Sequence, residues 1–174
     1  MADFFKQYYE KGVQIILKPV EFFKSMPTTG GYKDPLLFAL VTALIMGIGL
    51  TIITLGVGFL AIIFAPVAVT ISVFLAALLL LVCAKIVGGT GSYEATMRVV
   101  SYSNIVNVIG WIPIVSILGS IYGLVLTVLG VREIHKLTTA KAIIAVLIAI
   151  AIVFVIVVLL AVIGIGITGY IPRA

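Results

Sequence analysis

Val99 to Val131 form a run of 33 residues without Asp, Glu, Lys or Arg, and Arg98 and Arg132 stand at its two ends. A charge-free run of this length is typical of a segment buried in lipid, not of the core of a small soluble domain. Because both ends are basic, the positive-inside rule places both on the cytoplasmic side. The run must then cross the bilayer an even number of times. It therefore predicts a helical hairpin that bends near Trp111 to Pro113.

The composition of the whole chain is that of an integral membrane protein. Of its 174 residues, 63% are hydrophobic and 10% are charged, whereas about a quarter of the residues in soluble domains are charged. The net charge of +5 comes from basic residues scattered between apolar segments. That distribution argues against a nucleic-acid partner and indicates topology determinants that contact anionic membrane lipids. One cysteine, Cys83, and one histidine cannot form a disulfide or a metal cluster, and no cofactor is expected.

The first 34 residues are predicted to form a cytoplasmic amphipathic region. Apolar side chains recur at helical spacing within residues 3–17, and polar side chains occupy the opposite face. The apolar set is Phe4, Phe5, Tyr8, Tyr9 and Ile16, and the polar set is Lys6, Gln7, Lys11, Gln14 and Lys18. A second short helix is expected from Pro19, because proline suits the first helical position. Such helices lie in the membrane interface or pack on the cytoplasmic end of the bundle, and both arrangements can hold together.

Residues 35–174 are predicted to form a domain of five transmembrane helices, which makes the fold an all-α integral membrane protein. Pro35 to Ala84 comprises 50 residues without a charge, while a single span needs about 20. This stretch therefore contains two helices, and its glycines and proline place their connection between Gly56 and Pro66. The hairpin gives the third and fourth helices, and the aliphatic stretch from Ala142 to Ile163 gives the fifth.

The predicted hairpin is short for two full spans and a turn. Either the third helix begins near Tyr93 and Arg98 extends its side chain to the interface, or the pair enters the bilayer without crossing it fully. With full crossings, ten of the eleven Lys and Arg residues fall on one side and only Arg173 falls on the other. We therefore expect a multi-pass protein of the cell membrane with a cytoplasmic N-terminus and an external C-terminus.

Small side chains at four-residue steps predict faces on which helices approach closely. These sets are Ala39, Ala43, Gly47 and Thr51 on the first span, Ala68, Ser72 and Ala76 on the second, and Gly119, Gly123 and Thr127 on the fourth. Packing of this kind replaces the hydrophobic driving force that is absent in lipid. The faces are expected to join helices within the bundle or between subunits, so the partners are membrane lipids and either a second copy or another membrane protein.

The glycine-rich loop that begins at Gly88 is a poor candidate for a phosphate-binding loop. It lacks the Gly-Lys-Ser/Thr ending and follows a membrane helix instead of a strand. Ser92 is instead expected to cap the next helix. Glu94 and Arg98 stand four residues apart, a spacing that predicts an ion pair on one helical face.

Polar side chains inside or beside the apolar segments are the candidates for function. Ser101, Asn104 and Asn107 either form interhelical hydrogen bonds or line a path for an ion or small solute. His135 is either a solvated loop residue or lipid headgroup contact, or else a proton sensor or catalytic base. One histidine, one cysteine and no acid inside any span provide no catalytic constellation. We therefore expect a protein that is not an enzyme.

Several short motifs, taken in order, carry a family resemblance. They are Pro19 to Lys24, Gly31-Tyr32, Asp34 to Phe38, Gly88 to Asn104, Trp111 to Pro113, Tyr122, Gly130 to His135, and Thr139 to Lys141. Their order and spacing resemble the prokaryotic branch of the Yip family of Rab-interacting membrane proteins over nearly the whole chain. The resemblance implies a five-helix bundle with a cytosolic N-terminus.

Eukaryotic members of that family are linked to vesicle traffic, small GTPases and membrane shaping. This chain departs from them, because its N-terminal region is only about 35 residues long and lacks the Tyr-Gly-Pro type motif. The expected function is that of a non-enzymatic membrane protein that organises or shapes the membrane or recruits partners. The alternative is a small channel or transporter for an ion or small solute.

Overall fold

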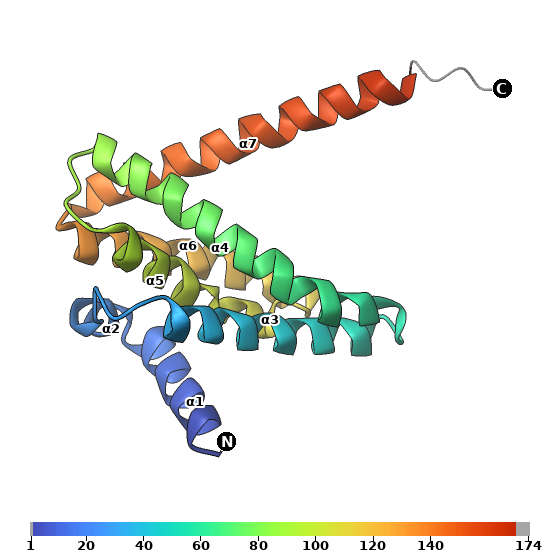
Figure 1. Ribbon diagram of the computed structural model, residues 1–174, viewed down its shortest axis with the longest axis horizontal. Coiled ribbons are helices and arrows are strands. Elements are labelled where there is room, and N and C mark those ends of the chain that lie inside the picture. Colours follow the sequence, from blue (N-terminus) through green and yellow to red (C-terminus); the bar gives the residue numbers. More distant parts are fainter. Residues whose placement is uncertain (1, 170–174) are drawn as a thin grey trace.

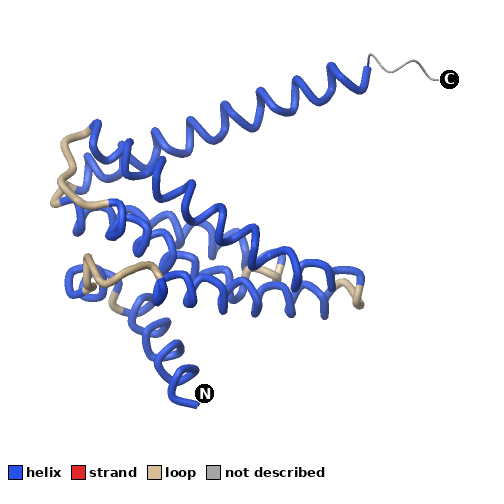
Figure 2. Tube along the Cα trace, in the orientation of Figure 1, coloured by secondary structure: helices blue, strands red, loops and turns tan. Residues whose placement is uncertain are grey.

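The computed structural model describes residues 2–169, which consist of helices and the loops between them (Figure 2). The elements are α1 (Ala2–Leu17), α2 (Pro19–Ser25), α3 (Lys33–Ile53), the short 3-10 helix η1 (Val57–Phe59), α4 (Leu60–Ile86), α5 (Tyr93–Ser103), the 3-10 helix η2 (Asn104–Ile109), α6 (Pro113–His135) and α7 (Thr139–Gly169). The prediction for Arg173 falls outside the described residues.

Within residues 2–169, four helices are long and apolar enough to cross a membrane: α3, α4, α6 and α7. Two of them come from the charge-free stretch before Lys85, as its length predicts. The chain turns between them at Leu55 and Gly56, where both residues have positive φ, and η1 follows. Pro66 lies inside α4 and not in the connection. A membrane helix tolerates an internal proline because neighbouring groups satisfy the freed carbonyl groups.

The prediction of five spans is not confirmed, because the expected third span has a different character. It is made of α5, an amphipathic helix of 11 residues, and η2, a 3-10 helix of six residues. The third helix does begin at Tyr93, and most side chains from Ala95 to Ser103 are buried. Protein surrounds this segment, so it does not need the continuous apolar surface that lipid demands. The chain turns at Trp111, and Pro113 opens α6.

The helices form a bundle from which the last one diverges (Figure 1). α3 and α4 run side by side, α5, η2 and α6 pack against them, and α1 and α2 lie at one end. Only the first part of α7 packs on the bundle, through the buried residues Ala142, Ala145 and Val146. From Ile150 to Val162 its side chains are exposed in the isolated chain.

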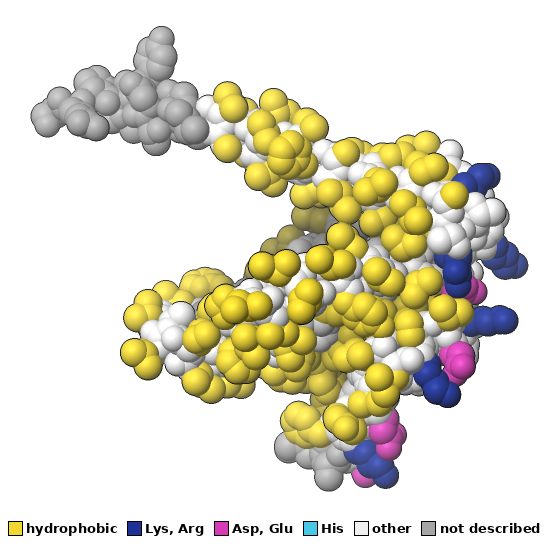
Figure 3. Space-filling model, turned by 180° about the vertical axis from the view of Figure 1, so that it is seen from behind, with side chains coloured by type: hydrophobic (Ala, Val, Ile, Leu, Met, Phe, Trp, Pro, Cys, Tyr) yellow, Lys and Arg dark blue, Asp and Glu magenta, His cyan; other side chains and the backbone are white. Residues whose placement is uncertain are grey.

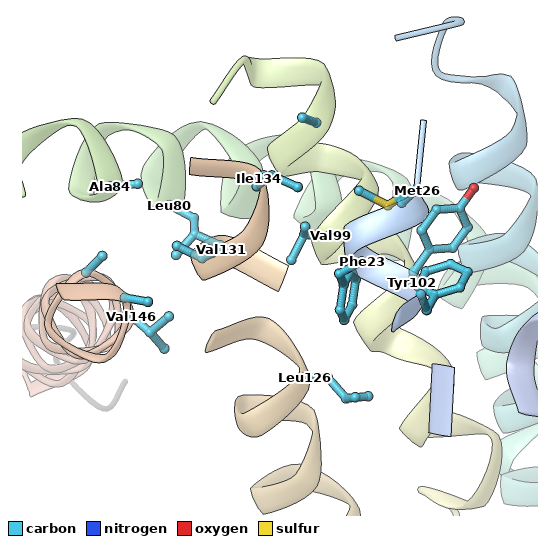
Figure 4. Close-up of a cluster of buried hydrophobic side chains, with 14 of the residues drawn as sticks. Phe23, Met26, Leu80, Ala84, Val99, Tyr102, Leu126, Val131, Ile134 and Val146 are labelled. Carbon is cyan, nitrogen blue, oxygen red and sulfur yellow. The ribbon is translucent and has the colours of Figure 1, made fainter. Parts of the chain in front are cut away.

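The N-terminal helices share the main hydrophobic core with the bundle. Phe22, Phe23 and Met26 of α2 are buried, as is Ile15 of α1. Figure 4 shows Phe23 and Met26 among side chains of α5 and α6, with Val99 beside Phe23. The expectation that the amphipathic region packs on the end of the bundle therefore holds for this apolar set. Other apolar side chains of α1 remain exposed.

Charged side chains gather at one end of the molecule, and hydrophobic side chains cover the rest of the visible face (Figure 3). We call this region the charged end. It comprises α1, α2, the starts of α3, α5 and α7, and the ends of α4 and α6. Its exposed cations include Lys18, Lys24, Lys33, Lys85, Lys136 and Lys141. This gathering matches the division of basic residues that the topology argument uses.

The small residues of α3 and α6 pack inside the bundle. Ala39, Ala43 and Gly47 are buried in α3. On α6, a Cβ added at Gly119 or Gly123 would lie 3.5 or 3.0 Å from atoms of Val106 in η2. Gly123 therefore lets α6 approach η2 closely, whereas the distance at Gly119 is that of an ordinary contact.

The ridge predicted on α4 does not pack within the bundle, because Ala68, Ser72 and Ala76 are exposed. A contact between subunits at this ridge stays a prediction. The buried face of α4 carries Val73, Ala77, Leu80, Cys83 and Ala84 instead. Small residues occur on two faces of this helix, so their spacing alone cannot identify the face that packs. Cys83 is a buried core residue.

Candidate functional site

The Arg98 and Glu94 pair fastens the loop between α2 and α3 to the start of α5. Ser92 caps α5 by accepting a hydrogen bond from the Ala95 amide at 3.2 Å. One turn later, Arg98 Nη2 donates to Glu94 Oε1 at 3.3 Å and to the Gly31 carbonyl at 2.7 Å. The Gly31 amide in turn donates to Glu94 Oε1 at 2.7 Å. Two side chains on one helical turn therefore hold both backbone polar groups of a single glycine.

Arg98 does not extend to the surface as predicted, since it is only 4% exposed. Its charge is balanced by Glu94 and by the Gly31 carbonyl, which makes burial tolerable. Its Nε has no hydrogen-bond partner among residues 2–169. A buried guanidinium donor without an acceptor is uncommon, because leaving it unpaired is unfavourable by about 1–3 kcal/mol or more.

His135 is fully buried, so the expectation of a solvated loop residue or headgroup contact is wrong. The loop between α4 and α5 covers its ring. The Gly91 amide donates to Nδ1 at 3.1 Å, and Nε2 lies 3.0 Å from Thr96 Oγ1. Thr90 adds a backbone hydrogen bond to the His135 carbonyl at 3.2 Å. The last residue of α6 thereby holds the glycine-rich loop in place.

The hydrogen bonds determine the protonation state of His135. An amide can only donate, so Nδ1 must be an unprotonated acceptor. Thr96 Oγ1 donates to the Ser92 carbonyl at 2.8 Å, which leaves its oxygen free to accept a hydrogen bond from Nε2–H. The ring is therefore neutral, with its hydrogen on Nε2. His135 therefore has a structural role, because both ring nitrogens already form hydrogen bonds inside the protein.

Arg132 has a local role at the end of α6. Its Nη2 and Nε donate to Glu133 Oε1 at 2.6 and 2.9 Å. Its Nη1 lies 3.4 Å from Thr139 Oγ1 at the start of α7. Lys136 ends the helix in the left-handed conformation, with φ of 53°. These contacts shape the turn that leads from α6 into α7.

Asn104 and Asn107 form hydrogen bonds along their own segment. Asn104 Nδ2 donates to the Val100 carbonyl at 2.9 Å, and Asn107 Nδ2 donates to Asn104 Oδ1 at 2.8 Å. These two amides therefore do not form the predicted interhelical hydrogen bonds. Asparagine competes with the backbone for hydrogen bonds, and this pair lies where the α-helix gives way to η2. The buried hydroxyl groups of Ser101 and Ser103 have no partner in the described chain.

Asn104 and Ser103 line a cleft of about 580 Å³ among α4, α5, α6 and α7. Most of its other lining residues are aliphatic, including Leu79, Leu80 and Val153. The diverging course of α7 opens this cleft at the side of the bundle (Figures 1 and 3). Among residues 2–169, no group of three or more His, Cys, Asp and Glu side chains could hold a metal ion.

Sequence reasoning missed two sets of contacts. Gly89 and Gly91 pack on His135, where an added Cβ would come within 2.8 and 2.9 Å of Nδ1. The sequence does contain a signal for this contact, because both glycines belong to the glycine-rich run that begins at Gly88, which was considered above only as a phosphate-binding loop. The second contact joins Tyr8 of α1 to Thr42 of α3, whose hydroxyl oxygens lie 2.8 Å apart. Burial raises the pKa of Tyr8, and the hydrogen bond to Thr42 partly offsets this effect.

The comparisons with known proteins identify the family of this chain. No curated protein and no solved structure matches it significantly. The sequence model of the Yip1 domain matches residues 13–161, which include the last turn of α1, α2 to α6 and most of α7. This match covers most of the 174 residues, so the chain belongs to the Yip1 domain family of membrane proteins.

Proposed function

We propose that this protein is a non-enzymatic organiser of the membrane, which uses α1 and α2 to occupy the surface of one leaflet. The observation that carries the proposal is the division of the α1 surface into two apolar parts. One part is bound to the bundle, and the other is exposed. A helix held in this way adds apolar volume to one side of a bilayer at a fixed distance from the membrane spans.

The bound part of α1 has specific anchors. Ile15 is fully buried in the core. Tyr8 makes the hydrogen bond to Thr42, and Tyr122 of α6 donates its hydroxyl hydrogen to the Ile16 carbonyl at 2.6 Å. These contacts join α1 to two membrane spans.

The exposed part of α1 consists of aromatic and aliphatic side chains. Phe5 is 57% exposed and Tyr9 is 69% exposed, and Phe4 and Leu17 are exposed as well. Lysines and acids occupy the opposite side, at the charged end (Figure 3). Interfacial helices bury such an apolar face about 5–10 Å into the boundary between headgroups and acyl chains. We call this exposed apolar face of α1 the wedge. Its insertion expands one leaflet relative to the other.

The proposed orientation places the charged end in the cytoplasm. The fifth crossing is then completed by α5 and η2, whose 17 residues extend roughly 28 Å. The hydrocarbon core is about 30 Å thick, so this buried segment nearly matches it. Five crossings from a cytoplasmic N-terminus leave the C-terminus outside the cell.

The alternative function, a channel or transporter, has less support. Its path would need polar side chains that face an aqueous space. The cleft beside Asn104 is mostly aliphatic, and the two asparagine side chains already bond within their own segment. A cleft of this kind suits acyl chains better than an ion.

Liposome reconstitution tests the proposal. At equal protein-to-lipid ratios, the wild-type chain should reduce the mean vesicle diameter measured by cryo-electron microscopy. The double variant Phe5→Gln and Tyr9→Gln should lose most of this effect, because it removes two exposed apolar side chains without touching the core. The matched control is Glu10→Gln on the polar face of α1, which should act as the wild type. Unchanged vesicles with the wild-type protein, or equal action of the double variant, would contradict the proposal.

A further inference from the structure

A small polar cavity of about 220 Å³ lies where α1, α2, α3 and α5 meet at the charged end. Its polar lining is Lys11, Gln14, Ser25, Asp34, Arg98 and Tyr102. The Yip1 domain assignment and the proposed wedge give this cavity no role. It brings two cations, one carboxylate and three neutral polar groups to the level at which a membrane protein meets lipid headgroups.

The cavity has a buried arginine in its lining. Arg98 lines it, and the side chain of Arg98 is only 5% exposed. Its Nη2 bonds to Glu94 and Gly31, but its Nε has no partner among residues 2–169. Because Arg98 lines the cavity, an acceptor that enters it can approach the guanidinium group. A phosphate oxygen is a strong acceptor for a guanidinium group.

A second cation lies on the same wall. Lys11 Nζ is 5.4 Å from the centre of the Tyr102 ring, a cation–π distance. No ion pair to Lys11 occurs within residues 2–169. Lys11 and the Arg98 guanidinium group therefore offer two positively charged groups to one ligand.

The carboxylate of Asp34 determines which kind of phosphate group fits. Asp34 lines the same cavity and forms no ion pair in the described chain. It would repel a plain anionic phosphate, but it would attract a cation attached to one. The lining of the first cavity is therefore complementary to a zwitterion that carries a phosphate and an ammonium group.

A neighbouring cavity indicates that the zwitterion belongs to a lipid. It has a volume of about 300 Å³ and shares Lys11 and Asp34 with the first cavity. Its other lining residues are Phe4, Gln7, Tyr8, Lys33, Leu37 and Phe38, of which Phe4 and Leu37 are exposed apolar side chains. A molecule with an apolar part next to its phosphate would use both cavities.

We propose that the paired cavities bind the phosphoethanolamine headgroup of a membrane phospholipid, with its phosphate at Arg98 and Lys11 and its ammonium group at Asp34. The part of the second cavity beside Phe4 and Leu37 receives the glycerol end of the acyl chains. The bound lipid then fastens α1 to α3. The inference rests on the proposed position of α1 at the membrane surface, but its test measures lipid selectivity and not vesicle shape.

Native mass spectrometry of the delipidated full chain in detergent tests this site. Equal amounts of phosphatidylethanolamine and phosphatidylglycerol with identical acyl chains are added, and the ratio of the two bound lipids is measured. Wild-type protein should prefer phosphatidylethanolamine by about tenfold, the effect of one charge-assisted hydrogen bond. Asp34→Asn should abolish this preference, because it removes the partner of the ammonium group and the repulsion of the anionic lipid. Lys11→Gln should weaken the binding of both lipids about fivefold.

The matched controls are Asp3→Asn and Lys24→Gln, which change exposed charges at the same end of the molecule but outside both cavities. Both controls should bind lipid as the wild type does. An unchanged lipid ratio in Asp34→Asn, or equal binding by Lys11→Gln and Lys24→Gln, would overturn the proposal. Free phosphoethanolamine at millimolar concentration should not displace the lipid. If it did, the site would belong to a soluble compound and the lipid assignment would be wrong.

Discussion

His135 shows how a single residue organises the charged end. Its carbonyl and Nδ1 bond to the loop between α4 and α5, and its Nε2 contacts Thr96 of α5, so it connects the end of one span to the start of the buried helix α5. A lone histidine in a basic segment predicts solvent contact. The opposite result arises because Gly89 and Gly91 have no side chains, which allows the loop backbone to close over the ring.

Replacing His135 with alanine should destabilise the protein by about 3 kcal/mol, because the change leaves a cavity and an unpaired Gly91 amide. The measurement is thermal unfolding in detergent, in which the midpoint should fall by several degrees. Lys136→Ala is the matched control, since Lys136 is the next residue and its side chain is exposed. Equal midpoints for the two variants would show that the ring does not hold the loop.

At the scale of the element, α6 shows how glycine positions decide which helices touch. A Cβ at Gly130 would lie 2.5 Å from Val99 Cγ1 of α5, a distance that real Cβ contacts do not reach. At Gly119 the nearest atom is the Val106 carbonyl oxygen, at an ordinary contact distance of 3.5 Å. Gly130 and Gly119 therefore differ in how closely a neighbouring segment approaches. The four-residue spacing in the sequence predicted close packing at Gly119 and Gly123 and did not single out Gly130.

Gly130→Ala should consequently destabilise the bundle by about 1–3 kcal/mol, since α5 and α6 must separate to admit a methyl group. Gly119→Ala should be neutral or slightly stabilising, because alanine favours the helix and meets no close contact. Unfolding of both variants in the same detergent checks the difference. The packing described between α5 and α6 would be incorrect if the order of stability were reversed.

The sequence predicted the helices that face lipid better than the segments that are buried among other helices. Long apolar runs identify α3, α4, α6 and α7, because the bilayer thickness determines their length. α5 and η2 are surrounded by other helices, so hydropathy says little about them. The change from α-helix to η2 at Asn104 likewise depends on local side-chain hydrogen bonds, which no periodicity reveals.

The candidate site was predicted only in part. The spacing of Glu94 and Arg98 predicts their ion pair, which the structure contains. Their shared partner Gly31 is 63 or more residues distant in the sequence, and only the folded chain brings it close. The unpaired Nε of Arg98 and its cavity depend on how four helices meet. Such a site has no local sequence signature.

At the scale of the whole molecule, the gathering of basic residues at one end leads to a topology test. In a Cys83→Ser background, single cysteines are placed at Thr90, Lys136 and Leu55, which are exposed. A membrane-impermeant thiol reagent applied to intact cells should label Leu55→Cys only. Thr90→Cys and Lys136→Cys should react only after the cells are opened, because they lie at the charged end. Labelling of Thr90→Cys and Lys136→Cys from opposite sides would refute the proposed topology.

The divergence of α7 has a mechanical consequence. Its 31 residues make a rod of about 46 Å, which exceeds the roughly 30 Å of hydrocarbon available to it. Hydrophobic mismatch of this size is relieved by tilt. Only the first turns of α7 pack on the bundle, so the tilt of α7 depends on the thickness of the surrounding bilayer. The width of the cleft beside Ser103 depends on this tilt, and therefore on the bilayer thickness as well.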